Sequence, residues 1–100
     1  MPDVPLLPGV EALASEGFVT GASGRNWAGY GTDVELDGAS DLDRLLLTDP
    51  QTSGGLLVAC APDALPSVLE IFRNEGFERA TAIGRLTTGA PKVRVVTTPT

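Results

Sequence analysis

Glycine and proline interrupt this chain at short intervals, and their spacing limits what it can fold into. The 100 residues include twelve glycines and eight prolines. Proline breaks the interior of a helix or a central strand, and glycine weakens both, so the regular elements must be short. A chain of this length buries roughly two-thirds of the surface that its unfolded form exposes. We therefore expect a single partial domain over residues 1–100, with a thin core, as in a piece of something larger.

Charge and hydrophobicity exclude several classes of protein. Hydrophobic residues make up 42% of the chain and charged residues 20%, which is typical of a folded globular protein. The net charge is −6, and nine of the thirteen acidic residues fall within residues 1–50. Such a chain repels phosphate backbones, so nucleic acid is not an expected partner. No apolar run approaches the roughly 20 residues of a membrane span, so no membrane partner is expected either.

The N-terminal residues and the cysteine content indicate a compartment. The chain starts Met-Pro-Asp-Val-Pro, without the basic start or the apolar stretch of a signal peptide. Its one cysteine cannot form an internal disulfide, which suits a reducing environment. The expected location is the cytoplasm. The chain has no histidine, so acid–base schemes that rely on imidazole are excluded.

Two short helices are predicted in the first half of the chain. Residues 10–16 form the first, and Gly17 is placed to end it as a left-handed residue, with Phe18 folding back onto the last turn. Ser40 is the predicted N-cap of the second helix, and Asp43 completes a capping box. This helix runs to about Leu47.

The second half of the chain predicts one longer helix and three strands. The helix runs from an Asp63 cap to about residue 75, with Gly76 ending it and Phe77 packing back; its apolar face is Leu65, Val68, Leu69 and Phe72. The apolar run 56–61 is typical of a strand covered on both faces. Residues 80–86 and 92–96 are two further predicted strands. The fold class is therefore α+β, a mixed β-sheet flanked by helices.

Residues 20–31 form a predicted glycine-rich loop, because four glycines fall within twelve residues without an apolar period. Arg25 and Asn26 in this loop have two interpretations: they reach a phosphate, or they hold the loop in shape. Trp27 and Tyr30 form either a stacking surface or, preferably, a lid over the local core. Residues 97–100 are a tail.

The segment 49–56 carries the most informative chemistry. Consecutive glycines let backbone N–H groups converge on an anion, and neighbouring hydroxyls add donors. The candidate anion-binding residues are Gln51, Thr52, Ser53, Gly54 and Gly55. The alternative is a helix-to-strand turn in which glycine serves tight backbone geometry, with a positive φ at 54 or 55. No lysine lies nearby and no helix follows the glycines, so the segment is not a P-loop.

Other polar residues favour structural interpretations. Cys60 lies in an apolar run, where a cysteine packs as a small hydrophobe and is not catalytic. Asp33, Glu35 and Asp37 alternate at strand spacing, which indicates a solvated face, with a metal site as the minor alternative. No catalytic residue and no metal ligand is therefore assigned within the chain.

The order of several short motifs resembles the C-terminal part of a selenophosphate synthetase, or selenide, water dikinase. The main motif is Asp-Pro-Gln-Thr-Ser-Gly-Gly-Leu-Leu at residues 49–57. Four other features agree in order: Pro-Leu-Leu-Pro-Gly at 5–9, Gly-Arg-Asn at 24–26, the helix within 62–76, and Ala-Ile-Gly at 82–84. The resemblance runs from about residue 4 to residue 96.

This resemblance implies an ATP-dependent enzyme of the superfamily of aminoimidazole ribonucleotide synthetase. Such enzymes have an N-terminal dimerising domain and a C-terminal α+β domain, with ATP held between them. The family makes selenophosphate, AMP and phosphate from selenide, ATP and water, with Mg²⁺. Its reactive cysteine or selenocysteine, nearby lysine and metal-binding aspartates belong to the N-terminal half, and none of those motifs occurs here.

Several expectations follow from the resemblance. The chain would provide one wall of the ATP site through Gln51–Gly55 and Arg25 with Asn26, and would need the N-terminal catalytic domain as its partner. Alone, it is expected to bind no ATP or Mg²⁺, to be inactive and to form a homo-oligomer. Two alternatives remain open: another ATP-using synthetase or kinase of the same superfamily, and a free-standing non-catalytic module that binds an anion or a partner.

Overall fold

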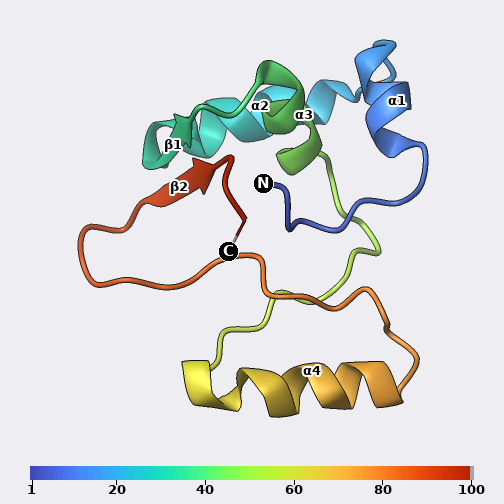
Figure 1. The fold of residues 1–100 in the computed structure, drawn as a ribbon. Helices are drawn as coiled ribbons and strands as arrows, with labels where there is room; N and C mark the ends of the chain where they lie inside the picture. Colours follow the sequence, from blue (N-terminus) through green and yellow to red (C-terminus); the bar gives the residue numbers. More distant parts are fainter. Residues whose placement is uncertain (100) are drawn as a thin grey trace.

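A computed structural model describes residues 1–99 and confirms the α+β class. Thr100, the last residue of the predicted tail, lies outside the described residues. The elements in chain order (Figure 1) are α1 Val10–Ser15, α2 Gly21–Tyr30, the 3-10 turn η1 Gly31–Asp33, β1 Val34–Asp37, α3 Asp41–Leu47, the 3-10 turn η2 Pro62–Ala64, α4 Leu65–Asn74 and β2 Val93–Val96.

The elements fall into two parts. Helices α1, α2 and α3 and both strands lie together, while α4 lies apart at the end of two long connections (Figure 1). β1 pairs with β2 in parallel, with Val34 opposite Val93. Within residues 1–99 this two-stranded sheet has parallel pairing only, so the mixed strand direction that we predicted is not seen.

Helix α3 starts with the predicted capping box. The Ser40 hydroxyl accepts a hydrogen bond from the Asp43 backbone N–H at 3.1 Å, and the Asp43 carboxylate accepts one from the Ser40 N–H at 2.9 Å. Two backbone donors that the helix itself leaves unpaired are thereby satisfied. This prediction is confirmed.

Helix α4 ends as predicted, but it does not start as predicted. Gly76 has a φ of +91°, its N–H donates to the Arg73 carbonyl, and the Phe77 N–H donates to the Phe72 carbonyl at 2.9 Å. The rings of Phe72 and Phe77 meet edge to face with centroids 6.3 Å apart, which closes the helix end with an apolar contact. At the start, Asp63 lies inside η2 and makes no capping hydrogen bond, so the predicted cap is wrong.

The predicted loop at residues 20–31 is wrong, because Gly21–Tyr30 is helix α2. A glycine in a helix costs only about 1 kcal/mol relative to alanine, which tertiary contacts can offset. Ser23 is 2% exposed, and Asn26 makes a hydrogen bond to the end of α3. Packing against the neighbouring helix therefore supports a sequence with little intrinsic preference for helix.

Two predicted strands are also absent. Residues 56–61 and 80–86 form neither helix nor strand, whereas the predicted strand at 92–96 is confirmed as β2. Every residue of the run 56–61 is exposed, although the run was expected to be covered on both faces, and within residues 1–99 it pairs with no other strand. A strand exists only when a partner satisfies its backbone groups, so the sequence pattern alone was insufficient.

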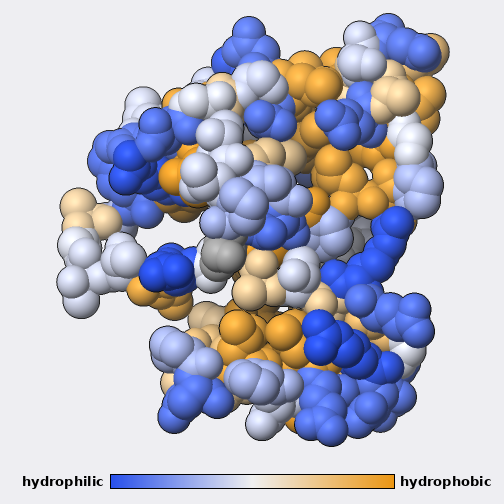
Figure 2. Space-filling model, in the orientation of Figure 1, coloured by the Kyte–Doolittle hydropathy of each residue, from blue (hydrophilic) through white to orange (hydrophobic). Residues whose placement is uncertain are grey.

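The core is thin, as expected. Ala14, at 8% exposure, is the one buried apolar residue among residues 1–99. Apolar residues gather on the side of α4 that faces the rest of the molecule (Figure 2), yet no residue of α4 is fully buried. Leu56, Leu57 and Leu86 are each more than 80% exposed. The described chain therefore leaves many of its large apolar side chains exposed.

Candidate phosphate-binding turn

The candidate turn starts at a well-anchored residue. Thr48 follows the last residue of α3 and is 4% exposed. Its hydroxyl donates to the Arg44 carbonyl at 2.8 Å, and its N–H donates to the same carbonyl at 3.1 Å. Pro50 lacks an N–H and restricts Asp49 to extended backbone, which ends the helix here. The segment 49–56 therefore starts directly after an anchored residue, Thr48.

Asn26 lies at this anchored residue. Its side-chain amide donates a hydrogen bond to the Thr48 carbonyl at 2.8 Å, which joins α2 to the end of α3. Because a carbonyl only accepts, Asn26 must present its Nδ2 donor there. The structure thus brings one of the two predicted residues of the 20–31 segment to the start of the turn, and uses its donor internally.

The centre of the turn is open to solvent. Residues 49–61 are all exposed, and Thr52 and Ser53 form the tip. Neither hydroxyl makes a hydrogen bond within residues 1–99. The Gln51 amide lies 3.4 Å from the Asp49 carboxylate, at the outer limit of a hydrogen bond. Both hydroxyls are therefore available to a ligand.

Glycine has a different role in this turn from the one predicted. Neither Gly54 nor Gly55 has a positive φ. A Cβ added at Gly54 would lie 2.8 Å from the Gln51 Cβ, whereas a Cβ at Gly55 would meet nothing within 4 Å. Gly54 is therefore required because its backbone packs closely on Gln51. At Gly55 neither the φ angle nor the space around the backbone requires glycine.

Arg25 is exposed, and its side chain lies along α2 towards Gly21. Its Nη1 lies 3.4 Å from the position that a Cβ at Gly21 would occupy. In the described part of the chain it makes no hydrogen bond or ion pair with residues 49–56. Its guanidinium remains free to take an anion, but the structure does not bring it to the turn.

Trp27 and Tyr30 lie near side chains of both strands, and their role as a lid over the local core stays a prediction. They line a largely apolar cavity of about 240 Å³ together with Val34, Leu36, Arg44, Leu47, Thr48, Val93 and Val95. The Arg44 guanidinium lies 5.3 Å from the centre of the Trp27 ring, a cation–π contact. A Cβ at Gly31 would lie 2.7 Å from that ring, so the close approach of the backbone needs glycine.

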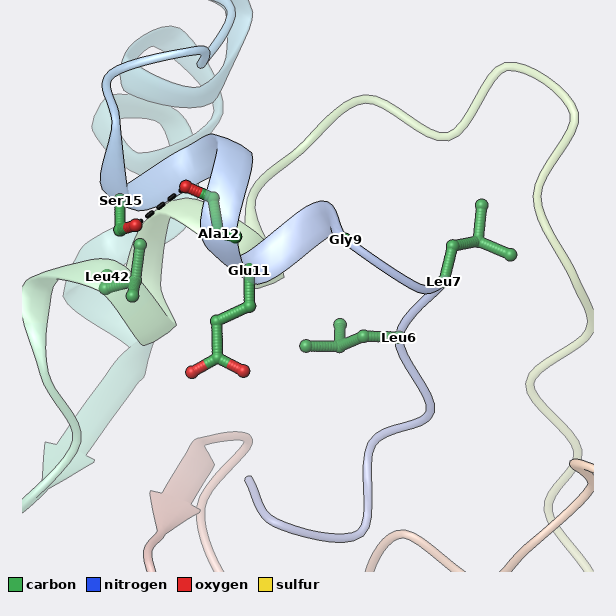
Figure 3. Close-up of a pocket in the computed structure, with 7 residues that line it drawn as sticks. All are labelled: Leu6, Leu7, Gly9, Glu11, Ala12, Ser15 and Leu42. Carbon is green, nitrogen blue, oxygen red and sulfur yellow. Dashed lines mark hydrogen bonds between the residues drawn. The ribbon is translucent and has the colours of Figure 1, made fainter.

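An open hollow of about 550 Å³ was not predicted. It is lined by Leu6, Leu7, Gly9, Glu11, Ala12, Ser15 and Leu42 (Figure 3). Leu6 points into the hollow and Leu7 away from it (Figure 3). The Ser15 hydroxyl already donates to the Ala12 carbonyl at 2.7 Å, which leaves Glu11 as the one charged group of the lining. The Pro-Leu-Leu-Pro-Gly segment was the available signal for this feature.

The remaining predicted residues divide between confirmation and correction. Cys60 is exposed, so its expected burial is wrong. Asp37 forms an ion pair with Arg94 across the sheet, in keeping with a solvated strand face. Across residues 1–99, no three Asp, Glu, Cys or His side chains gather as metal ligands. In the same residues, no helix is long and apolar enough to span a membrane.

Comparison with known proteins confirms the resemblance. The chain is 62% identical over 93 residues to a selenide, water dikinase of Burkholderia pseudomallei. Identity is 58% to that of Pseudomonas straminea over the same length, and 51% over 94 residues to that of Rhizobium meliloti. Each match covers 92–93% of this chain but only 26–27% of the relative, in a C-terminal portion. No protein-family model matches the chain.

Proposed function

We propose that this chain forms the C-terminal part of a selenophosphate synthetase. The similarity to selenide, water dikinases on which the proposal rests runs over nearly the whole chain. The complete enzyme would convert selenide, ATP and water into selenophosphate, AMP and phosphate. The observation that carries the proposal is 62% identity over 92% of this chain. Because the chain spans about a quarter of its relatives' length, the rest of the active site would come from an N-terminal catalytic domain, in the cytoplasm.

The turn formed by Gln51, Thr52, Ser53, Gly54 and Gly55 would bind phosphate groups of ATP or of the product. Its support is the pair of exposed hydroxyls at the tip and the anchored Thr48 at its base. Phosphoryl transfer depends mainly on positioning and on stabilising charge, which hydroxyl and backbone donors on a fixed turn can provide. Arg25 would add charge from α2, and Asn26 would set the distance between α2 and the turn.

The described residues do not fit a Mg²⁺ site of their own. Mg²⁺ prefers carboxylate and phosphate oxygens, and no group of three acidic side chains gathers within residues 1–99. When bound, the ion would neutralise phosphate charge, with its carboxylates supplied by the missing part of the enzyme. The 100-residue chain alone is therefore expected to release no AMP from ATP in the presence of selenide.

A chimera tests the proposal. This chain would replace the matching C-terminal quarter of the Burkholderia pseudomallei dikinase, and selenide-dependent AMP release would be measured. We expect the chimera to be active and both separate pieces to be inactive. A chimera that folds with the melting temperature of the parent but releases no AMP would contradict the proposed function. Release of AMP by the 100-residue chain alone would contradict the proposed division of labour.

A further inference from the structure

The cavity of about 240 Å³ next to the sheet is bounded by several elements of this chain. Its floor is one face of the sheet, where Val34 lies opposite Val93 and Leu36 lies opposite Val95. Its walls come from α2 and from the end of α3. The cavity is therefore formed by the packing of helices on the sheet and is not an apolar patch on a single element.

A single positive charge lies in this apolar lining. Among the described residues, Arg44 is the one charged residue that lines the cavity, and it is half-buried. Its guanidinium lies 5.3 Å from the centre of the Trp27 ring and makes no hydrogen bond or ion pair within residues 1–99. A guanidinium carries five N–H donors in a planar fork, and stacking on an aromatic ring leaves the edge of that fork free. The cavity therefore offers paired donors and a positive charge to an anion.

The volume of the cavity limits the size of a ligand. An engineered apolar cavity of about 150 Å³ binds benzene, whereas sites for drug-sized ligands begin at about 300 Å³. A cavity of about 240 Å³ thus suits one ring with one short substituent, and it is too small for a whole nucleotide. The site is therefore separate from the candidate phosphate-binding turn.

We infer that this cavity binds a small aromatic carboxylate, with the ring on the sheet face and the carboxylate on Arg44. The carboxylate accepts two parallel N–H hydrogen bonds from the guanidinium fork. Trp27 and Tyr30 contact the ring from α2, in the offset or edge-to-face arrangements that aromatic rings prefer. This binding goes beyond the proposed function, because neither ATP nor selenide takes part in it.

Fluorescence of the unchanged chain tests the ligand class. Trp27 is the one tryptophan of the sequence, so its emission reports on the cavity directly. Titration with 4-fluorobenzoate should change this emission until it saturates. The alcohol 4-fluorobenzyl alcohol has the same ring without the charge, and it should bind about tenfold more weakly because it cannot pair with the guanidinium. Acetate carries the charge without the ring and should leave the emission unchanged.

Three variants test the role of the lining. Arg44→Gln should weaken binding of 4-fluorobenzoate about tenfold and leave the affinity for the alcohol unchanged, a difference that general damage to the fold would not produce. Arg73→Gln removes an exposed arginine of α4 outside the cavity, and it should change neither affinity. Val95→Phe enlarges a side chain of the floor and should abolish binding of both compounds, with an unchanged circular dichroism spectrum.

The chimera tests whether the site persists in the longer protein. The fluorine NMR signal of 4-fluorobenzoate should broaden when the chimera is added, and should not broaden with the chimera that carries Val95→Phe. Three results would overturn the inference: equal affinity of the unchanged chain for the acid and the alcohol, unchanged acid binding by Arg44→Gln, and no broadening by the chimera. In the last case the N-terminal part of the enzyme fills the cavity. None of these measurements uses ATP or selenide, so an inactive chimera that binds 4-fluorobenzoate contradicts the proposed function alone.

Discussion

Asn26 and Thr48 are joined by a 2.8 Å hydrogen bond from the side-chain amide of α2 to the carbonyl that follows α3. Thr48 is buried, so its carbonyl has little access to water as a substitute partner. An acceptor that loses its donor in such a place remains partly unsatisfied. The bond thus fixes α2 against the residue from which the candidate turn departs.

Asn26→Ala is expected to destabilise the chain by about 1 kcal/mol, because it removes this bond from the carbonyl of a buried residue. Urea unfolding followed by circular dichroism measures the change. The control is Arg25→Ala, which removes an exposed neighbour on the same helix and should cost less than about 0.5 kcal/mol. Equal losses for the two variants would show that the bond does not stabilise the fold. If Asn26→Ala in the chimera instead weakens ATP binding and leaves stability unchanged, the result would support a contact between the Asn26 side chain and phosphate.

Ser53→Ala in the chimera separates ligand binding from architecture. The Ser53 hydroxyl is exposed and makes no hydrogen bond within residues 1–99, so its loss should leave the melting temperature unchanged. If the turn binds phosphate, affinity for ATP should fall. Ser67→Ala on α4 removes the same group at an exposed position away from the turn, and should change neither quantity. A lower melting temperature with normal kinetics for Ser53→Ala would assign the turn to architecture.

The two glycines of the turn should respond differently to alanine. Gly54→Ala forces a Cβ within 2.8 Å of the Gln51 Cβ, so the turn must open to accommodate it. Gly55→Ala meets open space at a φ that alanine accepts, and it should be neutral or stabilise by about 0.5 kcal/mol through the unfolded state. Melting temperatures and ATP affinities of the two chimeras measure the contrast. A larger loss at Gly55 than at Gly54 would contradict the geometry.

The capping box of α3 offers a test of local stability. Ser40→Ala removes the acceptor for the Asp43 N–H and should cost about 1 kcal/mol in urea unfolding. Ser40→Asp keeps an acceptor at the cap and should recover most of that loss. If aspartate is no better than alanine, the side-chain oxygen is not what stabilises the helix start.

The variant Ser23→Ala is expected to be more stable than the unchanged chain. It is 2% exposed, and its hydroxyl has no hydrogen-bond partner within residues 1–99. A buried hydroxyl without a partner costs about 1–3 kcal/mol, so Ser23→Ala should raise stability. Ser15→Ala, which removes an exposed hydroxyl already bonded to the Ala12 carbonyl, serves as the control and should not raise it. A loss of stability on Ser23→Ala would indicate that the hydroxyl finds a partner, for example a water molecule.

The features that could be predicted from the sequence are the ones that local chemistry decides. The Ser40–Asp43 box and the Gly76–Phe77 helix end each lie within a few residues, and both are as expected. Helix α2 and the unpaired run 56–61 depend on distant partners, which composition does not reveal. For the site, the motif located an exposed turn, but the bond between Asn26 and Thr48 joins residues 22 positions apart. Such a contact has no sequence signature.

The pairing of β1 with β2 has a consequence for how the chain folds during synthesis. Asp37 and Arg94, which form an ion pair across the sheet, are 57 positions apart. Contacts of such high sequence separation form slowly, because a long loop must close first. On a ribosome, α1, α2 and α3 would emerge well before β2. Until β2 emerges, β1 would lack its pairing partner. The nascent chain would therefore pass through a stage at which its sheet is half made and open to chaperones.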